Sequence, residues 1–265
     1  MGQVFTGKGI EIMHRWLLGT AVALAMAAPA IAADLPSRGP INKAPPPVAP
    51  IGYNWTGCYV AGGGGYGLFN QDTSRNFEGG GSSAEVTNGG RGWFGTVGGG
   101  CDVQFGSWVL GAFGDYDFAD LKGDVAIPGL NLVGREKQDS AWAVGGRLGY
   151  TLTPTILTYV NAGYTQARFD GFDLNSQNTG LPVGQSIGAQ TYSGWFLGSG
   201  FEYNLGFLPG LFWKTEYRFA QYDRENLAIL NGAGGQTGES ISSEKTIQTI
   251  RSELVWRFNW SGGRY

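Results

Sequence analysis

The sequence predicts an all-β fold, an eight-stranded antiparallel transmembrane β-barrel of the up-and-down type. Three observations predict it. The composition combines 47 Gly and 14% aromatic residues with only 15% charged residues, a profile that favours strands over helices. An export signal precedes the predicted strands. The connections between these strands alternate between long polar segments and short turns, which is typical of barrels that cross a membrane.

Residues 1–32 are predicted to form an upstream extension followed by a cleaved signal peptide. Basic Arg15 precedes an apolar stretch at 16–28, and Ala30 and Ala32 satisfy the small-x-small rule for signal peptidase. The apolar stretch is shorter than the roughly 20 residues that a membrane-spanning helix requires. We therefore expect cleavage after Ala32 rather than a membrane anchor.

Cleavage there would remove the only histidine of the chain, His14. Lys8, Glu11 and Arg15 would leave with it, so the net charge would shift from −3 to −4. A chain without histidine lacks the usual general base and the commonest metal ligand, which argues against Ser-His-Asp catalysis and histidine-based zinc sites. We expect no enzyme activity, catalytic residue, metal or cofactor. The acidity also argues against a nucleic-acid partner.

The mature chain is predicted to begin with a Pro-rich periplasmic arm at 33–52, followed by the barrel and a short C-terminal tail at 53–265. The eight strands are expected at 55–69, 92–105, 108–119, 138–150, 155–169, 189–203, 211–226 and 244–258. The long polar connections, at 70–91, 120–137, 170–188 and 227–243, are expected to form loops outside the cell. The short connections are expected to form periplasmic turns.

Alternation along the strands separates a lipid face from a lumen face. In the strand at 211–226, for example, Trp213 and Tyr217 share one face and Glu216 the other. The charged residues assigned to the lumen are Asp102, Asp115, Asp117, Arg147, Glu202, Lys214, Glu216, Arg218, Arg251, Glu253 and Arg257. Eight strands enclose only enough space for side chains. We therefore expect these charges to pair and plug the lumen. The strand at 155–169 does not resolve into two faces.

Aromatic residues near strand ends are expected to anchor the barrel at the level of the lipid headgroups. They are Trp55, Trp93, Trp108, Tyr150, Trp213 and Trp256. In the last strand, alternation places Leu254, Trp256 and Phe258 toward lipid. We expect these three to form the assembly signal that is read during insertion.

The two cysteines, Cys58 and Cys101, are predicted to form a disulfide, because the export signal sends them to an oxidising compartment. Antiparallel partners in a hairpin have residue numbers with a constant sum. The register that pairs the cysteines centres the hairpin within 79–81, and it also sets Tyr66 opposite Trp93. The alternative is two free, buried thiols.

Several segments together resemble a known family. They are Asn54 to Val60, Val97 to Asp102, Trp108 to Gly111, Gly114 to Asp117, Ala33 to Pro36 and Leu254 to Trp260. This set resembles the small outer-membrane β-barrel proteins of alphaproteobacteria, of the outer membrane immunogenic protein type, which are similar in architecture to the OmpA transmembrane barrel. The resemblance implies eight strands, a cell outer-membrane location, and roles in envelope integrity or surface contact without a defined reaction.

The partners expected on this basis are outer-membrane lipids, the barrel assembly machinery, and host or envelope surface ligands that contact the loops. Two alternative functions stay open at this point: a small porin-like channel, and a soluble exported barrel that binds a ligand as lipocalins do.

Overall fold

The computed structural model describes residues 53–258, so the predicted signal peptide, the Pro-rich arm and the C-terminal tail lie outside the described residues. The strands are β1 (Gly57–Asn76), β2 (Val86–Phe105), β3 (Trp108–Ile127), β4 (Leu132–Thr153), β5 (Ile156–Phe169), β6 (Phe172–Ser176), β7 (Pro182–Ile187), β8 (Gln190–Asn204), β9 (Leu211–Asn231) and β10 (Gln236–Phe258). No helix in this part of the chain is long and apolar enough to cross a bilayer.

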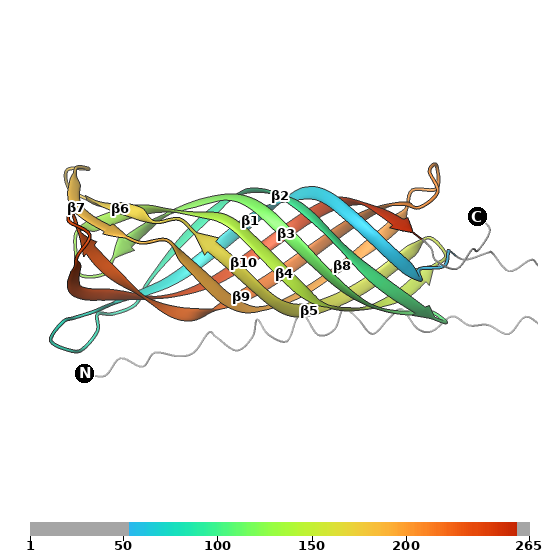
Figure 1. Ribbon diagram of the computed structural model, residues 1–265, viewed down its shortest axis with the longest axis horizontal. Coiled ribbons are helices and arrows are strands. Elements are labelled where there is room, and N and C mark those ends of the chain that lie inside the picture. Colours follow the sequence, from blue (N-terminus) through green and yellow to red (C-terminus); the bar gives the residue numbers. More distant parts are fainter. Residues whose placement is uncertain (1–52, 259–265) are drawn as a thin grey trace, which may run out of the picture. The chain divides into compact units, whose positions relative to one another are not determined.

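The strands close into a ring of eight antiparallel wall strands over residues 53–258 (Figure 1). β1 pairs with β2 on one side and with β10 on the other, which closes the ring. β5 and β6 both pair with β4, and β7 and β8 both pair with β9, so each of these two couples acts as one interrupted wall strand. The predicted fold class and the eight strands are confirmed.

The predicted long loops are wrong, because the wall continues through most of them. β1 runs to Asn76, β3 to Ile127 and β9 to Asn231, and only the segments at 77–85, 128–131, 177–181 and 232–235 connect the strands at this end. Ladder hydrogen bonds do not require apolar side chains on either face, so a barrel wall can continue into water with a polar outer surface. The polarity at 120–137 therefore marks the membrane boundary and not the end of a strand.

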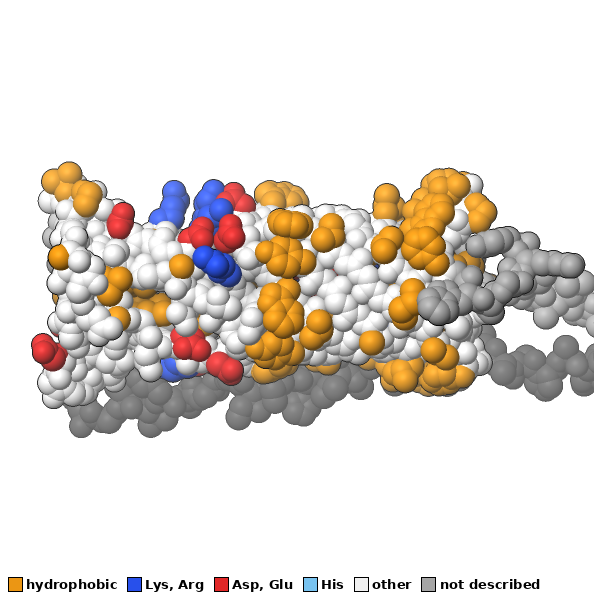
Figure 2. Space-filling view, in the orientation of Figure 1, with side chains coloured by type: hydrophobic (Ala, Val, Ile, Leu, Met, Phe, Trp, Pro, Cys, Tyr) orange, Lys and Arg blue, Asp and Glu red, His pale blue; other side chains and the backbone are white. Residues whose placement is uncertain are grey.

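β3 shows where that boundary lies. Its outward-facing residues are apolar from Trp108 to Phe118, which are 48% and 60% exposed, and charged at Asp120, Lys122 and Asp124. The apolar stretch has the length of roughly 9 to 11 residues that a tilted strand needs to cross a bilayer. Figure 2 shows the pattern as two bands of hydrophobic side chains and, beyond one of them, a band of charged side chains. In the charged band, a hydrogen bond from Lys122 lowers the pKa of Asp120.

Five of the six predicted anchors lie on the outer surface, and the sixth, Trp55, is a correction. Its side chain is fully buried, packs 4.9 Å from the Phe212 ring, and belongs to an apolar cluster with Val109 and Leu157 inside the barrel. Trp55 lies two residues before Gly57, the first residue of β1. It closes the end of the lumen near the short turns instead of anchoring the barrel in lipid.

The structure also resolves the two faces of β5 and the pairing of the cysteines. Leu157 is buried in the lumen, whereas Val160 is 53% exposed on the outer surface. Cys58 lies directly opposite Cys101 in the β1–β2 register, and a disulfide joins them. Both residues share the outward face of their strands, and Cys58 also lies at the seam between β1 and β10.

The first prediction concerns that seam. Phe258, the last residue of β10, lies opposite Cys58 of β1. Phe258 is 49% exposed on the lipid side, and a carboxylate there disfavours insertion. We expect Phe258→Asp to lower the outer-membrane level several-fold on immunoblots of membrane fractions, with Phe258→Leu as the matched control. Normal accumulation of a heat-modifiable Phe258→Asp protein would contradict the assembly role.

The second prediction concerns the disulfide. Unreduced, denatured mature protein is expected to show no thiol labelling, and two labelled cysteines should appear after reduction. Because the bridge closes a hairpin with a sequence separation of 43, we expect the Cys58→Ser, Cys101→Ser double variant to lose about 2 to 4 kcal/mol of unfolding free energy. Two reactive thiols in the unreduced wild type would refute the bridge.

Candidate functional site

The charged residues predicted for the lumen come together in two groups inside the barrel. The first group, called here the four-charge ring, consists of Asp102, Arg147, Glu202 and Arg257. The second, called the seven-charge cluster, consists of Asp115, Asp117, Lys214, Glu216, Arg218, Arg251 and Glu253. All eleven side chains are at most 10% exposed.

The four-charge ring alternates acids and bases. Arg147 Nη1 lies 2.5 Å from Glu202, and its Nε donates to Asp102 at 2.8 Å. Arg257 contacts the same two carboxylates, Asp102 at 2.7 Å and Glu202 at 2.6 Å. Each carboxylate therefore bridges both guanidinium groups. Two acids and two bases make the ring neutral, as burial at this depth requires.

Aromatic rings cover the guanidinium groups of this ring. The Arg147 guanidinium lies 4.7 Å from the Tyr59 ring centre and 5.3 Å from that of Tyr159, distances at which cation–π attraction operates. Two glycines make room for these rings. A Cβ on Gly100 would lie 2.6 Å from the Tyr59 hydroxyl, and one on Gly200 would lie 2.7 Å from the Tyr159 hydroxyl.

In the seven-charge cluster, Arg218 makes a two-pronged contact with Asp115 at 2.7 and 2.9 Å. Arg251 links Asp115 to Asp117, at 3.3 and 3.1 Å. Two further ion pairs extend the cluster: Arg218 contacts Glu216 at 2.8 Å, and Lys214 contacts Glu253 at 2.7 Å. The Tyr159 hydroxyl and the Asn161 amide each donate to Glu216 at 2.9 Å.

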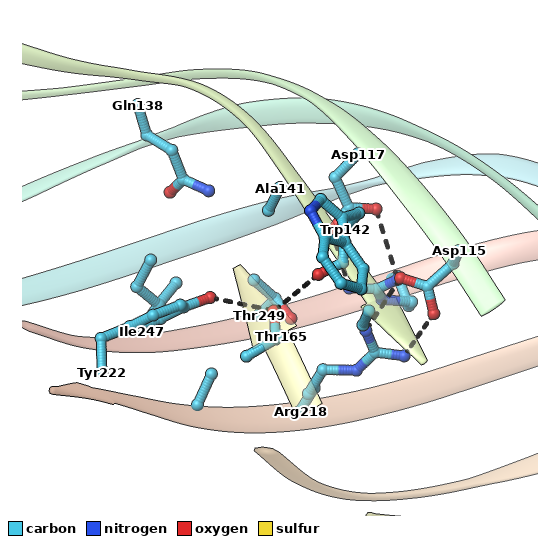
Figure 3. A pocket seen from close by; sticks show the side chains of 13 residues that line it. Asp115, Asp117, Gln138, Ala141, Trp142, Thr165, Arg218, Tyr222, Ile247 and Thr249 are labelled. Atoms are coloured by element: carbon cyan, nitrogen blue, oxygen red, sulfur yellow. Dashed lines mark hydrogen bonds and ion pairs between the residues drawn. The ribbon is translucent and has the colours of Figure 1, made fainter. Parts of the chain in front are cut away.

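A cavity of about 20 Å³ adjoins this cluster (Figure 3). Asp115, Asp117 and Arg218 line one side, and the Thr165 and Tyr222 hydroxyls, 3.3 Å apart, line the other. A water molecule needs a cavity of at least about 10 to 15 Å³. This space is therefore suited to a single water and is too small for an organic solute.

A third group of buried charges, the ion pair of Lys245 and Glu136, was not predicted from the sequence. Lys245 on β10 lies 2.6 Å from Glu136 on β4 and also donates to Gln71. The Phe169 ring centre lies 4.1 Å from its ammonium nitrogen. Lys245, Arg251 and Glu253 all have odd residue numbers, so alternation along this strand could have placed Lys245 on the lumen face with the other two. Glu136 fell in a predicted loop, and a register irregularity between Gln138 and Ser140 shifts its alternation relative to Arg147.

The geometry defines a class of protein: a membrane β-barrel with an apolar belt outside and buried paired charges inside. The chain belongs to the autotransporter beta-domain family, whose model matches residues 49–218. It is 28% identical over 252 residues to the 25 kDa outer-membrane immunogenic protein of Brucella canis, a match that covers 90% of this chain and 95% of the relative.

A solved structure agrees on the fold. The outer membrane protein OprG from Pseudomonas aeruginosa aligns with 78% of this chain and 99% of its own, with a TM-score of 0.51 and 13% identity. The attachment invasion locus protein of Yersinia pestis aligns with 74% of this chain and 99% of its own, with a TM-score of 0.36 and 12% identity. The predicted outer-membrane location and the predicted resemblance are confirmed.

The third prediction tests the four-charge ring. Arg147→Met would leave Asp102 and Glu202 with Arg257 as their only basic partner in the ring. Removing one partner of a buried ion pair typically costs about 3 to 5 kcal/mol. We expect a marked drop in the temperature at which the barrel loses its folded gel migration. Arg168→Met, at an exposed arginine on β5, is the matched control, and equal effects of the two variants would contradict the role of the ring.

Proposed function

We propose that this chain is a closed structural barrel that supports envelope integrity and presents its projecting rim for surface contact. The observation that supports a closed barrel is the filling of the lumen. Three buried apolar clusters, which include Trp55, Phe196 and Leu174, fill the lumen together with the four-charge ring and the seven-charge cluster. A pore would need a continuous polar path, and these packed apolar side chains disfavour one.

Surface contact is supported by the rim beyond the charged band. The turn at 177–181 and the start of β7 carry Leu181 and Val183, which are 65% and 42% exposed. Exposed apolar side chains at such a tip favour protein contact. The Brucella relative is named an immunogenic protein, which agrees with exposure of the rim. The partners proposed on this basis are lipids, the assembly machinery and surface ligands that contact the rim.

We also propose that the chain catalyses no reaction, because a mature chain cleaved after Ala32 has no histidine to act as a general base. Within residues 53–258, no group of three or more potential ligating side chains is arranged to hold a metal ion. The apolar belt, with Trp93 72% exposed, disfavours a soluble ligand-binding barrel.

The fourth prediction tests the closed lumen by planar-bilayer recording of the refolded mature protein. The wild type is expected to show no steady conductance. The Lys214→Ala, Glu253→Ala double variant removes a neutral pair at 2.7 Å and widens the lumen without leaving either charge without its partner. We expect its conductance to exceed that of the wild type. Stable stepwise conductance of the wild type would instead support a porin-like channel.

The fifth prediction tests the rim. An epitope inserted in the turn at 177–181 should bind antibody on intact cells, whereas the same epitope at Gly106–Ser107, in a short turn at the opposite end, should bind only after the membrane is permeabilised. Flow cytometry measures both. The reverse pattern would overturn the assigned orientation and the surface-contact role.

A further inference from the structure

A groove of about 500 Å³ lies on the outside of the barrel wall, where the charged band meets the apolar belt. It spans β10, β1, β2, β3 and β4, and Arg91, Lys122, Asp124 and Arg135 are among its lining residues. The backbone of Gly89 lines it between these side chains. The groove therefore places three basic groups and one acidic group around a recess in a chain whose overall net charge is −3.

The register places like charges directly opposite one another. Arg91 pairs with Lys122 across β2 and β3, and Lys122 pairs with Lys137 across β3 and β4. Like charges in such positions repel and destabilise the sheet. Asp120 relieves part of the repulsion, since it lies 2.9 Å from Lys122 and 3.7 Å from Lys137. Arg91 has no ion-pair partner among residues 53–258, so the row lacks an anion at its β2 end.

The groove lies at the level of the membrane where lipid headgroups are found. Trp93 lies two residues after Arg91 in β2, in the direction of the apolar belt. Its ring packs edge-to-face with that of Tyr66, with 4.8 Å between ring centres, and it is 72% exposed. Leu68, the partner of Arg91 on β1, is 50% exposed and lines the groove. Trp and Tyr mark the membrane–water interface. Basic side chains just outside that interface meet the phosphate groups of anionic lipids.

We propose that this groove binds the phosphorylated glycolipid headgroup of the outer leaflet. Arg91 and Lys122 contact a phosphate, and Arg135 lies near the headgroup at the opposite wall. The acyl chains run along Leu68 and Trp93. Arg135 is free to turn toward the ligand, because both side chains of its ion pair with Asp124 are about two-thirds exposed or more, and exposed ion pairs contribute little stability. The phosphate supplies the negative charge that Asp120 does not provide for Arg91.

The test is a binding titration of the refolded mature protein in detergent with bisphosphorylated lipid A, followed by Trp fluorescence. Each charge-assisted contact contributes enough for about a tenfold change in affinity. We therefore expect the Arg91→Ala, Lys122→Ala double variant to bind at least tenfold more weakly. Arg168→Ala, which removes an exposed arginine of β5 outside the groove, should bind within twofold of the wild type.

Further measurements distinguish the sources of the signal. Arg91→Lys should retain most of the affinity, and folded gel migration of every variant shows that the barrel is intact. Dephosphorylated lipid A is expected to bind at least tenfold more weakly, and inorganic phosphate is expected to compete only at far higher concentration. Equal loss in Arg168→Ala, equal binding of dephosphorylated lipid A, or displacement by equimolar inorganic phosphate would each overturn the proposal.

Discussion

The neutral ring formed by Asp102, Arg147, Glu202 and Arg257 is the constraint on which the rest of the barrel interior depends. Four charges that are at least 98% buried can remain ionised only if each meets an opposite charge. These residues lie on β2, β4, β8 and β10, so the ring forms only when the wall has closed. The glycines at 100 and 200 leave space both for the tyrosine rings that cover Arg147 and for the neighbouring backbone carbonyls of Ala112 and Thr215.

The outer surface follows a different rule from the lumen, because side chains on a strand point alternately to opposite sides. Polar burial inside can therefore coexist with a lipid-facing belt outside. In β3, Val109 is fully buried inside while Leu110 is 54% exposed outside. The wall then continues past the belt into water, with Asp120 and Lys122 replacing the apolar side chains on the outer face. The proposed lipid groove lies at that change of surface, and it does not depend on whether the lumen conducts.

Much of the fold could be predicted because the period of two is a local property. It placed Arg251, Glu253 and Arg257 on one face of the last strand and Leu254 and Trp256 on the other, as the structure has them. The prediction of long loops was wrong because strands that continue outside the membrane have a polar outer face. They therefore lack the apolar outward-facing residues by which the membrane-spanning strands were recognised. Trp55 was misplaced because a tryptophan before a strand can turn either way, and only the packing against Phe212 decides. Glu136 was missed because the register irregularity beside Gln138 changes the alternation of β4.

The sequence by itself determined the class of fold, the strand count and, in most strands, which side chains face lipid. These depend on composition and on alternation between near neighbours. Only the tertiary structure decided which charge meets which, since Arg147 and Asp102 are 45 residues apart and Lys245 and Gln71 are 174 residues apart. It also decided that Arg91 and Lys122 share one groove. Closure sets the register between strands distant in the chain, and register, unlike periodicity, is a property of two strands and not of one.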